Sequence, residues 1–137
     1  MKSLMKFFLL GVLLILPVCL SSCGGGTSSS NENYSGSSES ISQYNGKWEV
    51  FSPMDKPGSS ETFRLTLRGS HSAEIKYWET GFGYDNIIAE GSGEAYLNGN
   101  SIIVELTKGQ SRGMSFEFKI RNGVITLPDG TSLSKSY

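Results

Sequence analysis

From about Tyr44 to the end of the chain, turn-forming residues interrupt the sequence every 8 to 12 residues, and this spacing constrains the fold more than any other feature. Gly, Pro, Asn and Asp gather at these positions, as they do in the tight turns that connect β-strands. No window between the turns has the 3.6-residue apolar period of a helix. The sequence therefore predicts eight strands, at residues 47–52, 61–68, 72–79, 87–97, 101–106, 114–121, 124–127 and 131–135.

The pairing of three hairpins can be predicted, because a shift of one residue would move every side chain to the other face of the sheet. Asn122-Gly123 and Asn98-Gly99 are each expected to form a two-residue turn, and residues 69–71 a three-residue loop. The predicted pairs are Ile120–Ile125 and Phe118–Leu127, then Ala95–Ile102, Gly93–Val104 and Gly91–Leu106, and finally Leu67–Ala73, Leu65–Ile75 and Phe63–Tyr77. Each hairpin then has one apolar or small face. The predicted fold is all-β: a single small antiparallel up-and-down meander of about eight strands, as a closed barrel or a strongly curved sheet.

One face of the predicted strand 87–97 consists mostly of small residues. Its members are Ile87, Ala89, Gly91, Gly93 and Ala95. Three explanations are open: Phe116 and Phe118 of a neighbouring strand fill the space, the strand bends or bulges there, or the space is a ligand cavity.

The N-terminus has the layout of an export signal. Lys2 and Lys6 precede an almost wholly apolar stretch over residues 7–20. A retained transmembrane helix is the weaker interpretation, because the stretch is shorter than the roughly 20 residues needed to span a bilayer and Pro17 interrupts it.

The segment Leu20-Ser21-Ser22-Cys23 resembles the lipobox of bacterial lipoproteins. This resemblance implies that residues 1–22 are a signal peptide and that Cys23 carries the lipid. The alternative is an ordinary signal peptide with a chance cysteine. Cys19 would leave with the signal, so the mature domain would have no thiol for a disulfide, a metal site or a nucleophile.

Residues 23–43 are rich in Gly, Ser, Asn and Glu and are predicted to form a lipidated flexible tether before a folded domain at 44–137. Such a tether has a reach on the order of 25 Å. Gly24 follows the cysteine where inner-membrane lipoproteins tend to have Asp, so the resemblance implies the outer membrane of a bacterial envelope, on its periplasmic face or at the cell surface.

Charge and composition argue against several functions. The chain has 12 basic and 13 acidic residues, and removal of residues 1–22 would leave 10 basic and 13 acidic residues. There is no run of Lys or Arg, so nucleic-acid binding is not expected. His71 is the single histidine and lies in a predicted turn, so neither a metal site nor a catalytic triad is expected. Glu90, Glu94 and Glu105 alternate along polar faces, as solvated charges do. We expect no catalytic residue and no cofactor, and hence no enzyme.

Gly46-Lys47-Trp48 at the start of the first predicted strand is similar to the opening of lipocalins and related barrels. In that family the Trp closes one end of the barrel beneath a basic residue from the last strand. The resemblance implies a lipocalin-like barrel in which Trp48 and Lys135 have this structural role. The chain departs from the family by its shorter length and by a Lys in place of the expected Arg.

Trp78, Phe82, Tyr84 and Ile88 could form an exposed aromatic and apolar patch at one end of the barrel. Exposed patches of this kind often bind partners. The alternative is that the 80–86 loop folds over the barrel mouth and these side chains complete the core.

These observations favour a membrane-anchored, non-enzymatic binding module for a small apolar ligand or a protein partner. The other hypothesis is a small-barrel inhibitor of a protease or a lysozyme that acts through the 52–60 or the 80–86 loop. An apolar cavity lined by Phe63, Tyr77, Phe116 and Phe118 would favour the small ligand.

Overall fold

The computed structural model describes residues 40–136, which form one 3₁₀ turn and eight strands. The elements are η1 (Ser42–Tyr44), β1 (Gly46–Pro53), β2 (Ser60–Arg68), β3 (Ser72–Gly81), β4 (Tyr84–Asn98), β5 (Ser101–Lys108), β6 (Ser115–Arg121), β7 (Val124–Thr126) and β8 (Ser134–Ser136). The signal peptide, Cys23 and most of the tether predicted from the sequence lie outside the described residues. No helix within residues 40–136 is long and apolar enough to span a membrane.

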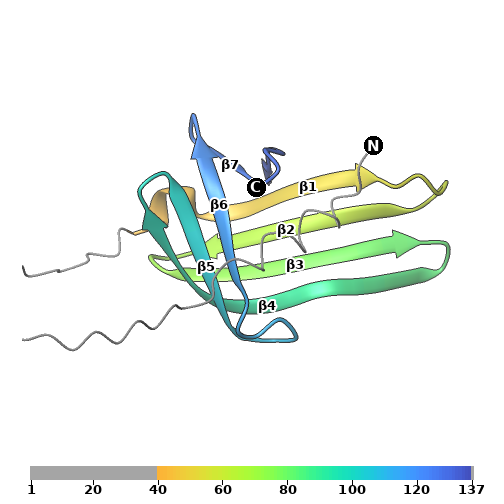
Figure 1. Ribbon diagram of the computed structural model, residues 1–137, viewed down its shortest axis with the longest axis horizontal. Coiled ribbons are helices and arrows are strands. Elements are labelled where there is room, and N and C mark those ends of the chain that lie inside the picture. Colours follow the sequence, from red (N-terminus) through yellow and green to blue (C-terminus); the bar gives the residue numbers. More distant parts are fainter. Residues whose placement is uncertain (1–39, 137) are drawn as a thin grey trace, which may run out of the picture.

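All eight strands belong to one antiparallel sheet in the order β7-β6-β5-β4-β3-β2-β1-β8. The sheet curls back on itself because β8 pairs with β1, while an isolated bridge from Thr126 to Ser132 links β7 to the segment that leads into β8. Figure 1 shows β1 to β4 as long neighbouring strands, with β5 and β6 crossing one half of them. The predicted all-β meander is confirmed, and its form is a nearly closed barrel.

A single apolar core fills the inside of the sheet. The core forms because each strand turns its apolar side chains to one face. In β6, for example, residues alternate strictly between buried and exposed. The core continues through every strand from β1 to β7 and through the ends of the described chain. Ile41 belongs to this core: its side chain is fully buried and its N–H bonds to the carbonyl of Ser70 at 3.0 Å. The folded part therefore extends back beyond Tyr44.

Two of the three predicted hairpin registers are confirmed. Asn122 and Gly123 both have positive φ, as a two-residue type I′ turn requires, and Ile120 pairs with Ile125. The ladder ends at the pair Lys119–Thr126 and does not reach the predicted pair Phe118–Leu127. Across the 69–71 loop, β2 and β3 pair as predicted. The third register is wrong by two residues, because Gly99, with φ of +57°, and Asn100 form the turn, and Asn98 pairs with Ser101. The observed pairs there are Ala95–Val104, Leu97–Ile102 and Gly93–Leu106.

The small residues of β4 lie where the strand bends, not around a cavity lined by Phe116 and Phe118. The pairing of β4 shifts twice, opposite Tyr77/Trp78 of β3 and at Ser92/Gly93 beside β5. At the second shift the backbone of β5 comes so close that a Cβ on Gly93 would lie 1.8 Å from the carbonyl oxygen of Glu105. Glycine is needed for this close approach.

Candidate functional site

Trp48 and Lys135 are brought together at the seam where the first and last strands meet. They are paired residues of β1 and β8, and the Lys135 Nζ lies 5.3 Å from the centroid of the indole ring. The buried indole donates a hydrogen bond from Nε1 to the carbonyl of Tyr44 at 2.7 Å. Gly46 leaves room for the lysine, since a Cβ there would lie 2.7 Å from its Cε. This contact joins the first and last strands, and Lys135 also lines a pocket of about 640 Å³ beside the seam.

The aromatic side chains proposed to line a cavity are packed against one another. The ring centroid of Phe63 lies 5.8 Å from that of Phe118 and 6.3 Å from that of Tyr77, and all three side chains are buried. Phe116 is buried as well. Two pockets on the described part of the chain have other linings, without these rings. The geometry at this point is that of a packed core.

The outer face of β1 to β4 carries a row of side chains that lie directly opposite one another across the four strands. In pairing order they are Phe51, Thr62, Trp78 and Ile87, which we call the outer row. Phe51 is 66% exposed and Ile87 is 39% exposed, while Trp78 is half-buried. The inner face of the same strands forms the core, so this row lies on the opposite face of the sheet.

Two cations hold the indole of Trp78 within the outer row. The guanidinium carbon of Arg64 lies 5.1 Å, and Nζ of Lys76 5.6 Å, from the ring centroid. Arg64 also forms an ion pair with Glu49 on the neighbouring strand. Such contacts restrict the indole at a solvent-exposed site. The row is therefore an apolar strip with an aromatic centre, and the neighbouring row of Glu49, Arg64, Lys76 and Glu90 places charges of both signs along one side.

The four residues of the predicted aromatic patch, Trp78, Phe82, Tyr84 and Ile88, do not form one surface in the structure. Trp78 lies on the outer face as expected, but Ile88 is half-buried and packs against the core. The bulge in β4 is the reason, because it pairs Ile87 with Trp78 and leaves Ile88 as the extra residue. Ile87, which was expected on the inner face, takes the outward place. Tyr84 is half exposed and lies over Gly81. It is three residues from Ile87, so alternation does not place it in the outer row.

The predicted 80–86 loop is instead a tight hairpin, in which Gly81 pairs with Tyr84 around Phe82-Gly83. Phe82 is 80% exposed at the tip, and its ring lies so close to Gly58 of the neighbouring 54–59 loop that a Cβ there would meet it at 2.9 Å. In Figure 1 both hairpin tips lie at the end of the sheet that β5 and β6 leave uncovered. The two tips are thus joined through one aromatic ring.

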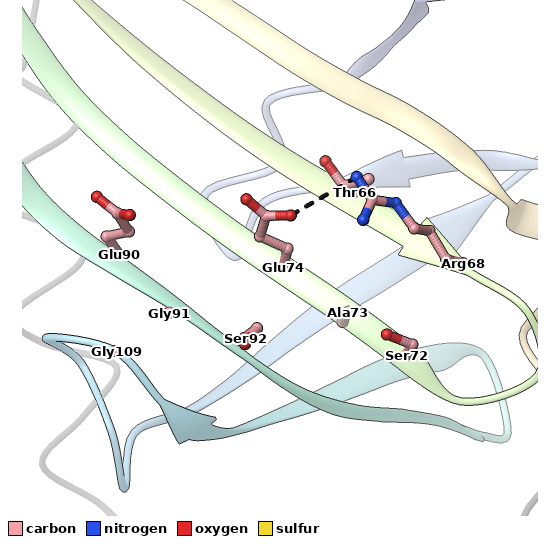
Figure 2. A pocket seen from close by; sticks show the side chains of 9 residues that line it. All are labelled: Thr66, Arg68, Ser72, Ala73, Glu74, Glu90, Gly91, Ser92 and Gly109. Atoms are coloured by element: carbon pink, nitrogen blue, oxygen red, sulfur yellow. Dashed lines mark ion pairs between the residues drawn. The ribbon is translucent and has the colours of Figure 1, made fainter.

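A polar groove of about 370 Å³ lies on β2 to β4, next to the start of the loop that follows β5. Figure 2 shows the carboxylates of Glu74 and Glu90 on the same side of the sheet, and an ion pair of 3.8 Å between Glu74 and Arg68. The remaining lining residues are Thr66, Ser72, Ala73, Gly91, Ser92 and Gly109. This lining of hydroxyls and charges does not suit an apolar ligand.

The hydrogen-bonded side chains on β5 and β6 form an ordinary ion-pair network. Lys119 donates to the hydroxyl of Ser101 at 2.9 Å, and Ser101 donates to Oε1 of Glu117 at 2.8 Å. The hydrogen bonds from Lys119 and Ser101 lower the pKa of Glu117, which makes it a weaker base. Within residues 40–136 no group of three His, Cys, Asp or Glu residues could hold a metal ion, and His71 is exposed in its turn.

Sequence reasoning missed Phe51 and Ile87. Phe51 could have been found by alternation, since Trp48 and Val50 point inward and an exposed Phe then falls on the polar face of the first strand. Ile87 could not have been found, because the direction of its side chain depends on the bulge.

Comparison with models of protein families, with curated proteins and with solved structures gave no match. The lipobox and lipocalin resemblances therefore stay predictions from the sequence.

Proposed function

We propose that this protein is a lipid-anchored lipoprotein of the bacterial envelope, held through Cys23, whose barrel is a non-enzymatic binding module for a protein partner. The partner contacts the outer row of Phe51, Thr62, Trp78 and Ile87. Of the two occupants expected from the sequence, the packed Phe63–Phe118 interior supports the protein over the small apolar ligand.

The observation that carries this proposal is the outer row itself. Exposed aromatic and branched aliphatic side chains are aligned across β1, β3 and β4 on a face whose strands already have their core on the other side. Soluble domains seldom expose contiguous apolar patches without an interaction that uses them. Rigid aromatic anchors with a charged rim are the usual centre of protein interfaces.

Charge suggests what the partner surface contains. Arg64 is neutralised by Glu49, whereas no ion pair is found for Lys76 among the described residues. A partner with an apolar patch and a carboxylate beside it would contact Trp78 and pair with Lys76 together. Such a pair at the rim would act mainly on the association rate and make it dependent on salt.

The anchor has its own test, which does not depend on the docking surface. Cys23→Ser should abolish acyl labelling and release the protein from the membrane fraction. Cys19→Ser is the matched control and should be labelled like the wild type. Unchanged labelling of Cys23→Ser would contradict the anchor and leave the binding proposal standing.

The docking surface is tested by affinity capture from solubilised envelope with three immobilised forms: wild type, Trp78→Glu and Val124→Glu. Val124 is the control because it is an exposed apolar residue, 37% exposed, on the distant strand β7. A protein that is retained by wild type and Val124→Glu but lost with Trp78→Glu is the expected result. Equal retention by all three forms, or a stoichiometric apolar molecule extracted from the purified barrel, would contradict the proposal.

The inhibitor hypothesis is the second candidate, and the joined hairpin tips favour it. Phe82 over Gly58 gives the 54–59 loop and the β3–β4 turn one common protruding surface. An inhibitor of a protease or a lysozyme would lose inhibition in Phe82→Ser and keep it in Trp78→Glu. The docking proposal predicts the opposite pattern for partner capture.

A further inference from the structure

The pocket of about 640 Å³ beside the seam has a basic lining, and we call it the basic pocket. It lies where β1 begins, β2 ends and β8 pairs with β1. Three of its lining residues are cationic, Lys47, Arg68 and Lys135, and none is acidic. Thr66 and Ser136 add hydroxyl groups. Ammonium, guanidinium and hydroxyl donors without a carboxylate among them suit an anionic ligand.

The charges of the basic pocket are largely left unneutralised. Lys47 and Lys135 form no ion pair within residues 40–136. Arg68 pairs with Glu74 at 3.8 Å, in the neighbouring polar groove that Figure 2 shows, and both side chains are exposed. An exposed ion pair of this length holds its partners only weakly. The positive charge of the pocket is therefore available to a bound anion.

Two features of the pocket wall favour a bound group. Lys135 is held in place, since its Nζ lies 5.3 Å from the centroid of the Trp48 ring and its stem passes over Gly46. Asn45 also lines the pocket, and its Oδ1 is buried without a hydrogen-bond donor in the described part of the chain. Buried polar atoms are nearly always satisfied by protein, water or a ligand. The wall is thus incomplete without a further polar group.

The basic pocket lies where the predicted tether joins the barrel. Ile41 is buried in the core and bonds to the carbonyl of Ser70, the residue after Gly69 of the pocket lining. In Figure 1 this end of β1 is opposite to the joined hairpin tips. A tether from Cys23 to residue 40 has a reach on the order of 25 Å, so a lipid surface that holds Cys23 is within reach of the pocket.

We propose that the basic pocket binds the phosphate of an anionic phospholipid headgroup. Lys and Arg are the side chains that recognise phosphate, and clusters of them are attracted to anionic lipid surfaces. The choice of a lipid rests on the proposed anchor, since lipid on Cys23 brings the membrane to this end of the barrel. Binding there would hold the hairpin tips away from the membrane. The outer row, on the face of β1 to β4, is not used in this contact.

The test is sedimentation with vesicles of the unlipidated chain 23–137 that carries Cys23→Ser, here the parent. The parent should bind vesicles that contain phosphatidylglycerol and not vesicles of phosphatidylcholine alone. Lys47→Glu reverses one exposed charge of the pocket and should weaken binding at least about fivefold at low salt. Lys56→Glu is the matched control and should bind like the parent, because Lys56 is exposed in the 54–59 loop at the opposite end.

Inorganic phosphate distinguishes a lipid headgroup from free phosphate. It should displace the parent from the vesicles more than chloride does at the same ionic strength. Phosphate that shifts the amide resonances of Gly69 and Ser136, in a chain that binds neither kind of vesicle, would overturn the lipid as the ligand. Equal binding to both kinds of vesicle, or by Lys47→Glu and the parent, would overturn the proposal as well. Because this chain has no lipid, such a failure leaves the anchor to its own test by acyl labelling.

Discussion

The hydroxyl of Tyr77 donates a hydrogen bond to Oε2 of Glu61 at 3.0 Å, and both side chains are buried between the neighbouring strands β2 and β3. Burial is the main cause that raises the pKa of Tyr77 above its ordinary value near 10, and the negative charge of Glu61 raises it further. This contact gives a buried carboxylate a partner within an otherwise apolar core, and it can be tested in two ways.

Tyr77→Phe should destabilise the barrel by about 1–3 kcal/mol, because it removes one hydrogen bond from a buried carboxylate without changing the packing much. Glu61→Gln keeps an acceptor for the Tyr77 hydroxyl and should cost less than removal of the donor. Urea unfolding of the three forms measures both changes. A Tyr77→Phe variant as stable as the wild type would show that the bond does not contribute.

The raised pKa of Tyr77 also predicts a loss of stability in alkali. The folded state holds the Tyr77 proton more tightly than the unfolded chain does, so this contribution is complete below about pH 10 and declines as the pH rises above that value. The decline approaches about 1.4 kcal/mol per pH unit. Unfolding free energies from pH 9 to 11 should fall more steeply in the wild type than in Tyr77→Phe. Parallel profiles would contradict the prediction.

Gly93→Ala should destabilise the barrel by about 3 kcal/mol or more, because its Cβ would overlap the backbone of β5 at Glu105. Gly99→Ala is the control: a Cβ there meets nothing within 4 Å, and only the positive φ of +57° opposes it, at a cost of about 1–2 kcal/mol. Thermal unfolding compares the two. Equal losses would mean that the close approach of β4 and β5 is not fixed as described.

Phe118→Ala should cost about 3–5 kcal/mol, since it leaves a cavity beside Phe63 in the centre of the core. The variant should then bind a small apolar probe such as benzene, which an engineered apolar cavity admits. The wild type should not bind the probe. Binding of benzene by the wild type would show that the interior is hollow and would revive the small-ligand hypothesis.

Much of the fold follows from local signals in the sequence. The pairing of Ile120 with Ile125 is determined by Asn122-Gly123, because only a two-residue type I′ turn allows positive φ at both positions. Asn98-Gly99 predicts the wrong register. It makes Gly99 the second residue of the turn, whereas the turn is Gly99-Asn100 and Gly99 is its first residue. The error moved pairs by two residues and so kept each side chain on its face.

The candidate site was harder to predict, because it depends on one irregularity. The pattern of β4 reads as a regular strand, and nothing in the residues near Ile87 and Ile88 marks the extra residue of the bulge. Strict alternation therefore placed Ile88 outward and Ile87 inward. Trp78 was placed on the correct face, because the loop at 69–71 sets the register of β3 independently of β4.

The central claim is that the barrel acts through its outer row, and cross-linking in living cells tests it most directly. A photoreactive phenylalanine analogue at Phe51, in a chain that carries its intact signal and Cys23, would report what lies against the row. The same analogue at Val124 is the control. The proposal predicts one protein adduct from Phe51 that disappears when Trp78→Glu is added, and none from Val124. No adduct from Phe51, or the same adducts from both positions, would contradict it.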